Sequence, residues 1–118
     1  MQDFQELKVW RRSHDLTIAI YQATSSFPRE EMFGLTRQIR SAAAFIGANI
    51  AEGCGRNGGA DFARFLQIAA GSASELANHM LLARDLGFLT PDHVNPIYRE
   101  LTEVRRMLMT LIQKVRAG

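Results

Sequence analysis

Apolar residues recur at intervals of three and four along nearly the whole chain. The C-terminal segment shows this most clearly, in the unbroken series Val94, Ile97, Leu101, Val104, Leu108, Leu111 and Val115. Such spacing places apolar side chains on one face of an α-helix, whereas a half-buried strand would need strict alternation, which no window shows. The sequence therefore predicts an all-helical protein.

Breaks in this pattern divide the chain into four helices. Prolines occur only at positions 28, 91 and 96, and glycines cluster between residues 53 and 59. Because the connections are short, consecutive helices should be antiparallel neighbours, which indicates one up-down-up-down four-helix bundle over residues 1–118. The predicted helices cover residues 5–26, 31–54, 61–87 and 92–116.

Residues typical of helix starts support these boundaries. Asp3 and Glu6 can form a capping box at the first helix. Asp61 is a suitable N-cap for the third helix. Thr90–Asp92 predicts the start of the fourth helix, although Asn95–Pro96 offers a competing start one turn later.

Glycines mark two predicted helix ends. Gly53 and Gly55 should let the second helix end and the connector turn. Gly87 should end the third helix, because glycine adopts the left-handed conformation without a steric penalty.

The composition is that of one soluble domain. The chain has 118 residues, of which 47% are apolar and 22% charged, enough for a single core. Its apolar runs are far shorter than the roughly 20 residues of a membrane helix, and its polar N-terminal segment does not resemble an export signal. The one cysteine, Cys54, has no disulfide partner. We therefore expect a cytoplasmic protein that does not bind membranes.

The basic residues are twelve Arg and two Lys, although the net charge is only +2. Arg is favoured at phosphate groups and interfacial ion pairs because its planar guanidinium binds two oxygen atoms at once. A GC-rich genome produces the same bias, so the composition leaves a nucleic-acid partner open.

The third predicted helix has a second line of mostly apolar residues beside its main one. A helix that is apolar over so wide an arc usually faces two partners. One partner is the core of the bundle, and the other is expected to be a second copy of the protein. This second line consists of Phe65, Ile68, Ser72, Glu75, His79, Leu82 and Leu86.

Polar residues on the second helix lie close to its apolar line. In an antiparallel arrangement Asn49 and Glu52 come near Trp10, whose indole N–H either could accept. Arg40 comes opposite Glu75, to which it could form a forked ion pair. We therefore predict a buried hydrogen-bonded network that fixes the register of the helices. A ligand-binding site and simple exposure are the alternatives.

No catalytic or metal-binding pattern has the required spacing. A di-iron bundle needs Glu-x-x-His motifs, but none of His14, His79 and His93 follows a glutamate by three residues. The glycine-rich connector lacks the strand, Lys and Ser/Thr of a phosphate-binding loop. Glu75 and His79 share one helix face, where ion pairing or an interface is the simpler explanation. We expect no catalytic residues, no metal and no cofactor, and hence no enzyme.

The fourth predicted helix carries basic residues that could bind an anion. Repetition of this face in an oligomer would strengthen its attraction for RNA or DNA. A solvated surface balanced by Glu100 and Glu103 is the alternative. The basic residues are Arg99, Arg105, Arg106, Lys114 and Arg116.

Several short motifs occur together along the chain: FP-x-x-E-x-x-GL, Q-x-R-x-A, N-I-A-E-G, a following Arg, F-L and G-S-x-x-E-L. They comprise Phe27, Pro28, Glu31, Gly34, Leu35, Gln38, Arg40, Ala42, residues 49–53, Arg56, Phe65, Leu66, Gly71, Ser72, Glu75 and Leu76, with Trp10 in the first helix. This combination resembles a bacterial family of four-helix-bundle proteins named for reading frames in intervening sequences of 23S rRNA genes. Ser41 stands where the family often has a second Arg, which removes one positive charge.

The resemblance implies a cytosolic bundle, and some relatives assemble as rings of five. It also implies kinship with the accessory variability determinant of diversity-generating retroelements, a basic pentamer that works with nucleic acid and reverse transcriptase. It supplies no reaction. The residues expected to lock the bundle or to join subunits are Trp10, Gln38, Arg40, Asn49, Glu52, Arg56, Ser72 and Glu75.

Three functions are compatible with these patterns. The first is a homo-oligomeric, pentameric scaffold that binds RNA or DNA without sequence specificity, or binds a nucleic-acid enzyme. The second is a small enzyme that uses Arg40, Asn49, Glu52 and Glu75 in a pocket. The third is a protein-interaction module that binds no nucleic acid.

Overall fold

The computed structural model describes residues 3–118, and every regular element in this range is helical. The prediction of an all-helical protein is therefore confirmed. The long helices are α1 (Lys8–Ala23), α2 (Leu35–Cys54), α3 (Gly59–Asp85) and α4 (Pro91–Ala117). Three short 3₁₀ helices are η1 (Phe4–Glu6), η2 (Thr24–Ser26) and η3 (Arg29–Glu31).

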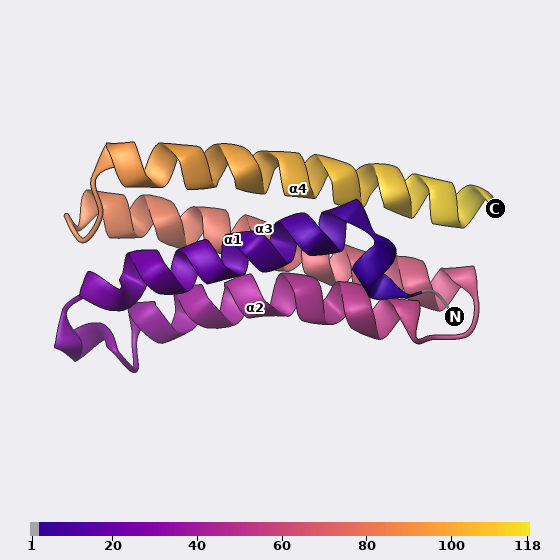
Figure 1. The fold of residues 1–118 in the computed structure, drawn as a ribbon, viewed down its shortest axis with the longest axis horizontal. Coiled ribbons are helices and arrows are strands. Elements are labelled where there is room, and N and C mark those ends of the chain that lie inside the picture. Colours follow the sequence, from indigo (N-terminus) through magenta and orange to yellow (C-terminus); the bar gives the residue numbers. More distant parts are fainter. Residues whose placement is uncertain (1–2) are drawn as a thin grey trace.

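The four long helices lie side by side along the long axis of a molecule that measures 45 × 23 × 19 Å (Figure 1). The colours of Figure 1 show the chain passing back and forth along this axis, with each connection joining neighbouring helix ends. α3 packs extensively against both α2 and α4, whereas α1 packs mainly against α2 and only lightly against α4. None of the helices in the described range is both long and apolar enough to cross a membrane.

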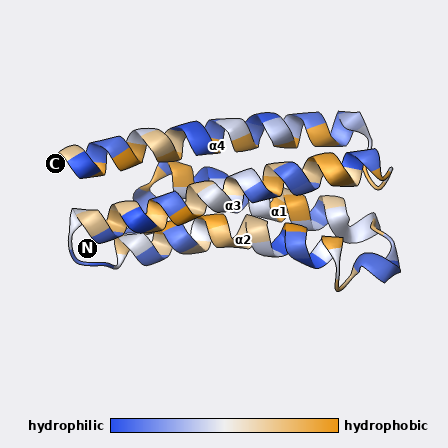
Figure 2. Ribbon diagram, turned by 180° about the vertical axis from the view of Figure 1, so that it is seen from behind, coloured by the Kyte–Doolittle hydropathy of each residue, from blue (hydrophilic) through white to orange (hydrophobic). Residues whose placement is uncertain are grey.

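One core runs through the bundle. Figure 2 shows hydrophobic segments alternating with hydrophilic ones along the helices, as expected when one side of each helix is buried. The apolar line predicted for the fourth helix contributes Val94, Leu101, Val104 and Leu108 to this core. Its largest fully buried side chains are Ile20, Ile39, Ile46, Ile50, Leu66, Leu76, Met80, Leu101, Leu108, Ile112, Val94 and Val104.

The predicted line in α4 departs from the observed core near the C-terminal end. Ile112 is buried there, whereas Leu111 and Val115 are only partly buried. A strict seven-residue repeat drifts by about 20° per heptad around a straight helix. After the buried Leu108, this drift brings Ile112 rather than Leu111 into the core.

α2 begins at Leu35 rather than at the predicted residue 31. The helix η3 and a turn over residues 32–34 come first. Glu31 then reaches forward, and its Oε1 accepts a hydrogen bond of 3.1 Å from the backbone N–H of Leu35. A Cβ atom on Gly34 would lie 2.9 Å from this oxygen. The E-x-x-G-L motif therefore forms a cap at the start of α2, and its glycine leaves room for the carboxylate.

Two other helices begin at residues that differ from the predicted ones. α1 begins at Lys8 rather than at residue 5. Asp3 instead caps η1, where its Oδ1 accepts a hydrogen bond of 3.0 Å from the backbone N–H of Gln5. α3 begins at Gly59, so Asp61 lies in its first turn and does not cap it. The turn is made by Gly58, whose φ of 95° lies in the region that glycine adopts most easily.

The predicted end of α3 at Gly87 is confirmed. Gly87 has a φ of 79°, and its N–H donates to the carbonyl oxygen of Arg84 at 3.0 Å. The N–H of Phe88 donates to the carbonyl oxygen of Ala83 at 2.9 Å. These two bonds form a Schellman motif, which satisfies carbonyl groups of the last turn.

α4 begins at Pro91 with Thr90 as its N-cap residue, as the Thr90–Asp92 sequence predicts. The competing start at Asn95–Pro96 is not used, and Pro96 lies inside the helix. Because proline has no N–H to donate, the helix lacks one backbone hydrogen bond at this position.

α2 ends at Cys54, as predicted, with Gly55 as its C-cap residue, but Gly53 does not contribute to this end. Gly53 is buried inside the helix, where a Cβ atom would lie 2.9 Å from Cδ1 of Phe62 and 3.0 Å from Cβ of Phe65. α2 continues to Cys54, and Gly55 follows it in an ordinary right-handed conformation. The glycine of N-I-A-E-G therefore allows α2 and α3 to approach each other closely.

We expect Glu31→Ala to lower the free energy of unfolding by about 1 kcal/mol, because it removes a helix cap. Gly34→Ala should act through the same carboxylate, which the new Cβ atom would displace. The two losses should therefore not add in a double-mutant cycle measured by urea unfolding. Glu30→Ala, at an exposed neighbouring position, is the control. Additive losses would show that Gly34 acts independently of the cap.

Candidate functional site

Asn49 and Glu52 do not take part in a buried network. Asn49 is half-buried, and its Nδ2 donates to the carbonyl oxygen of Phe45 in the same helix at 2.8 Å. Glu52 is exposed and pairs with Arg56 at 2.6 Å. The prediction that neighbouring helices satisfy these side chains is therefore wrong within the chain. The side of α2 that faces the core is formed by buried residues such as Ile46. Asn49 and Glu52 lie at the edge of this side, where they are less buried.

Arg40 turns toward α1, and its predicted pair with Glu75 is not formed. Its Nε donates to Oγ1 of Thr24 at 2.8 Å, and its Nη2 donates to the carbonyl oxygen of Tyr21 at 3.2 Å. The guanidinium also lies 4.7 Å from the centre of the Tyr21 ring. The prediction fails because this part of α2 presents Arg40 to α1 rather than to α3. Arg40 therefore ties α2 to the end of α1.

Trp10 contacts α2 by packing rather than through an amide or a carboxylate. Phe4 meets its ring edge-on at 5.0 Å, and His14 stacks on it at 4.8 Å. A Cβ atom on Gly47 would lie 3.4 Å from the indole Nε1. The indole therefore lies against the backbone of α2 at a glycine.

The polar motif residues share an outer surface with exposed apolar side chains. α2 presents Phe45, which is 56% exposed, and α3 presents Ile68, which is 42% exposed. Arg56, in the connector between the two helices, binds Glu52 of α2 and lies 4.8 Å from the centre of the Phe65 ring of α3. We call this surface the α2/α3 face and define it by Gln38, Phe45, Asn49, Glu52, Arg56, Phe65, Ile68, Ser72, Glu75, Leu82 and Leu86.

A second apolar surface lies where the chain turns from α1 into α2. Phe33 is 82% exposed, and Met32 and Tyr21 are also exposed. They border a hollow of about 310 Å³ that Arg37 and Arg40 also line. We call Tyr21, Met32 and Phe33 the Phe33 patch.

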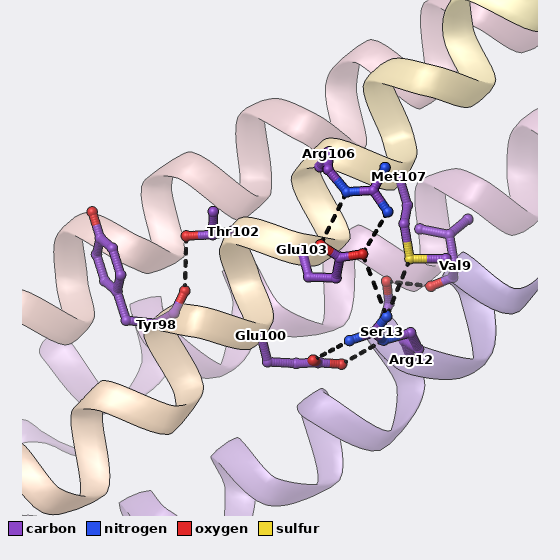
Figure 3. A network of polar contacts seen from close by, with 9 residues as sticks. All are labelled: Val9, Arg12, Ser13, Tyr98, Glu100, Thr102, Glu103, Arg106 and Met107. Carbon is purple, nitrogen blue, oxygen red and sulfur yellow. Dashed lines mark hydrogen bonds and ion pairs between the residues drawn. The ribbon is translucent and has the colours of Figure 1, made fainter.

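An ionic network centred on Arg12 joins α1 to α4 (Figure 3). The Nε of Arg12 donates to Glu100 at 2.9 Å, and its Nη1 lies 3.8 Å from Oε1 of Glu103. Arg106 donates to Glu103 at 3.0 Å. The hydrogen bond to Glu100 raises the pKa of Arg12, and the hydrogen bond from Arg106 lowers the pKa of Glu103. The sequence does not predict this network, because Arg12 and Glu100 are 88 positions apart.

This network determines which basic residues of α4 are balanced. Of the predicted anion-binding residues, Arg106 is paired, whereas the exposed Arg99, Arg105, Lys114 and Arg116 pair with no acid in residues 3–118. The structure does not bring them into one stripe. Arg105 lines a groove toward α3, whereas Lys114 lines a hollow on the side of α1.

The groove beside Arg105 runs between α3 and α4 and has a volume of about 490 Å³. α3 contributes short side chains to it and α4 contributes longer ones. No Asp or Glu lines it. The lining residues are Ala73, Ser74, Ala77, Asn78, Leu81, Tyr98, Leu101, Thr102, Arg105, Arg106 and Met109.

The potentially reactive side chains of Cys54 and His79 do not form a reactive or metal-binding cluster among the described residues. Cys54 is buried, and burial raises the pKa of its thiol, which disfavours the reactive thiolate. His79 is half-buried, and its Nδ1 has no hydrogen-bond partner. Within the described part of the chain, no three His, Cys, Asp or Glu side chains are grouped so as to hold a metal ion.

The fold and these surfaces define a small helical-bundle protein whose prominent features are apolar and basic surfaces. The model of the 23S rRNA-intervening sequence protein family matches residues 5–110. The chain belongs to this family, as its motifs predict. No functionally curated protein matches the chain.

A solved structure from Bacteroides thetaiotaomicron VPI-5482 has a similar fold. It is described as a protein with unknown function from the S23 ribosomal protein family. The two chains are 26% identical and superpose with a TM-score of 0.79, over 88% of this chain and 97% of the other. The shared fold therefore extends over nearly the whole bundle.

Glu103 should make the stability of the bundle depend on pH. Because Arg106 holds the pKa of Glu103 below its ordinary value of 4.5, its stabilising contribution is complete above about pH 4.5 and is lost as the pH falls through the lower folded-state pKa. We expect Glu103→Gln to be less stable than the wild type at neutral pH and to lose less stability on acidification.

Urea unfolding at neutral pH and at about pH 3 measures both effects. Glu30→Gln changes a carboxylate that forms no ion pair with any residue from 3 to 118, and it serves as the control. The same acid sensitivity in Glu103→Gln and the wild type would contradict the prediction.

Proposed function

We propose that this protein is a non-enzymatic, homo-oligomeric scaffold of the cytoplasm, in which five antiparallel bundles form a ring that binds RNA or DNA without sequence specificity. The observation that carries this proposal is the α2/α3 face, where the exposed Phe45, Ile68 and Leu82 accompany polar motif residues. Exposed apolar patches with a polar rim are typical of protein–protein interfaces. Apart from the half-buried His79, the residues of the second line predicted for the third helix form the α3 side of this face.

Two separate apolar surfaces favour a ring over a two-fold dimer. In a ring, each subunit uses one surface to contact a different surface of the next subunit. The α2/α3 face and the Phe33 patch can form such a pair. Phe33, at 82% exposed, is a side chain that the next subunit could bury.

Gly71 supports the use of the outer side of α3 as an interface. It lies inside the helix, where a Cβ atom would meet nothing within 4 Å. Glycine in a helix interior costs roughly 0.5–1 kcal/mol relative to alanine, and no contact with residues 3–118 accounts for this cost. Gly71 is about one turn from both Ile68 and Glu75, so close approach of another subunit to this side of α3 would explain it.

The unpaired cations of α4 support a nucleic-acid partner. Assembly would multiply the net charge of +2 per chain and repeat Arg99, Arg105, Lys114 and Arg116. Many weak phosphate contacts then act together as a multivalent surface. The charge is not arranged to read bases, so binding should depend little on sequence.

The two alternative functions have less support. An enzyme would need Arg40, Asn49, Glu52 and Glu75 to converge on a substrate. Arg40 instead bonds to α1, and Asn49 bonds to its own helix. A module that binds only protein would use the same apolar surfaces, and nucleic-acid binding distinguishes it from the proposed scaffold.

Light scattering should report a mass of about five subunits for the wild type at micromolar concentration. We expect Gly71→Ala to weaken this assembly while stabilising the subunit by roughly 0.5–1 kcal/mol, because alanine favours the helix. Gly53→Ala is the contrasting control. Its Cβ atom would lie 2.9 Å from Phe62 within the same chain, so it should destabilise the subunit by about 1–3 kcal/mol.

Mass as a function of concentration and urea unfolding of dilute protein measure the two effects separately. A monomeric wild type would contradict the oligomer. If Gly71→Ala raises subunit stability without weakening assembly, the interface does not include the outer side of α3.

Binding of nucleic acid by the assembled protein should fall steeply as salt rises from about 50 to 200 mM, because released counterions drive it. It should differ little between oligonucleotides of unrelated sequence. Fluorescence anisotropy with labelled oligonucleotides measures both properties. A clean oligomer that binds no RNA or DNA at about 50 mM salt would exclude the nucleic-acid function and favour the protein-only module.

A further inference from the structure

The groove between α3 and α4 is open because short side chains of one helix face long side chains of the other. Ala73, Ser74 and Ala77 form its α3 side, and Tyr98 and Met109 stand on its α4 side. Its volume of about 490 Å³ falls in the range of roughly 300–1,000 Å³ that is typical of small-ligand sites. The groove can therefore receive a group of the size of a small ligand.

The charge of the groove favours an anion. Arg106 is engaged by Glu103 at 3.0 Å, whereas Arg105 pairs with no acid in the part of the chain that the structure describes. No acidic side chain lines the groove. An entering phosphate would therefore meet an uncommitted guanidinium, which binds two phosphate oxygens well, and no repelling carboxylate.

The groove also offers a flat apolar surface. Tyr98 is 39% exposed, and its ring forms no aromatic or cation–π pair with residues 3–118. Figure 3 shows Tyr98 beside Thr102, whose hydroxyl donates to the carbonyl oxygen of Tyr98 at 3.0 Å. On the opposite wall, Ser74 and Asn78 line the groove and carry side-chain groups that can hydrogen-bond to a base.

We propose that the groove holds an unpaired stretch of a single-stranded nucleic acid, with a base stacked on Tyr98 and a phosphate at Arg105. The two residues are about 10 Å apart along the helix, so both groups can belong to one strand. Stacking on an exposed aromatic ring requires an unpaired base and tolerates any sequence. This proposal rests on the nucleic-acid binding proposed above and names the form of nucleic acid that the protein binds.

The test uses the assembled full-length protein and a fluorescein-labelled oligouridylate of about 20 nucleotides at about 50 mM salt. Heparin, a polyanion without bases, and a duplex of the same length are the comparison ligands. Tyr98→Ala should weaken binding of the oligouridylate roughly tenfold and leave binding of heparin unchanged. Tyr98→Phe keeps the ring and should bind as the wild type does.

Arg105→Ala should weaken oligouridylate binding. The slope of the logarithm of the binding constant against the logarithm of the salt concentration should fall by about one for each groove that the strand occupies. Arg99→Ala is the matched control, because Arg99 is exposed on the same helix but does not line the groove. It should affect the oligouridylate and heparin alike. Native mass and circular dichroism of each variant establish that assembly and helicity are retained.

Several outcomes would contradict single-strand binding in the groove without contradicting the proposed binding of nucleic acid. They are unchanged oligouridylate binding by Tyr98→Ala, an equal loss for heparin, and tighter binding of the duplex than of the single strand. Free uridine monophosphate that binds as tightly as the strand would overturn the assignment to a strand. A wild-type oligomer that binds neither single strand nor duplex would instead overturn the proposed nucleic-acid function, and the groove with it.

Discussion

The close packing of α3 against both of its neighbours is the constraint on which the rest of the structure depends. Gly53 of α2 meets α3 where a Cβ atom would not fit. Helices that bury such short side chains must approach closely to fill the space between them. Larger side chains beside the α2–α3 contact, such as Phe45 and Ile68, then lie at its outer edge. α3 itself buries Ala63, Ala69, Ala70, Ala73 and Ala83.

The short side chains of α3 have a different effect on the side of the helix that faces α4. Long side chains of α4, including Tyr98 and Arg105, stand over small residues and leave a groove. α1 and α4, which pack only lightly, are joined by the ion pairs of Arg12. These pairs engage Glu100 and Glu103, so that the remaining cations of α4 have no acidic partner in residues 3–118. The apolar and basic surfaces thus follow from how α3 packs against α2 and α4, and from how α1 is joined to α4.

The family motifs divide into those with a role inside the chain and those without one. Glu31 caps α2, and Gly53 permits close contact with α3. Gln38, Ser72 and Glu75, in contrast, form no side-chain hydrogen bond or ion pair with any described residue. They lie on the α2/α3 face, where a second subunit could provide the missing partners. Glu31 and Gly53 therefore act within the bundle, whereas Gln38, Ser72 and Glu75 belong to the subunit interface that we propose.

The sequence by itself determined that the chain is helical, where most of its core residues lie, and how α3 ends at Gly87. These features depend on residue spacing and local backbone preferences, which a linear sequence contains. Only the tertiary structure decided that Arg40 binds α1 and that Arg12 joins Glu100. Each of these depends on which way a side chain turns around its helix and on which helix lies there. The spacing of residues along the chain does not determine this direction, because a difference of one position moves a side chain by about 100° around the helix axis.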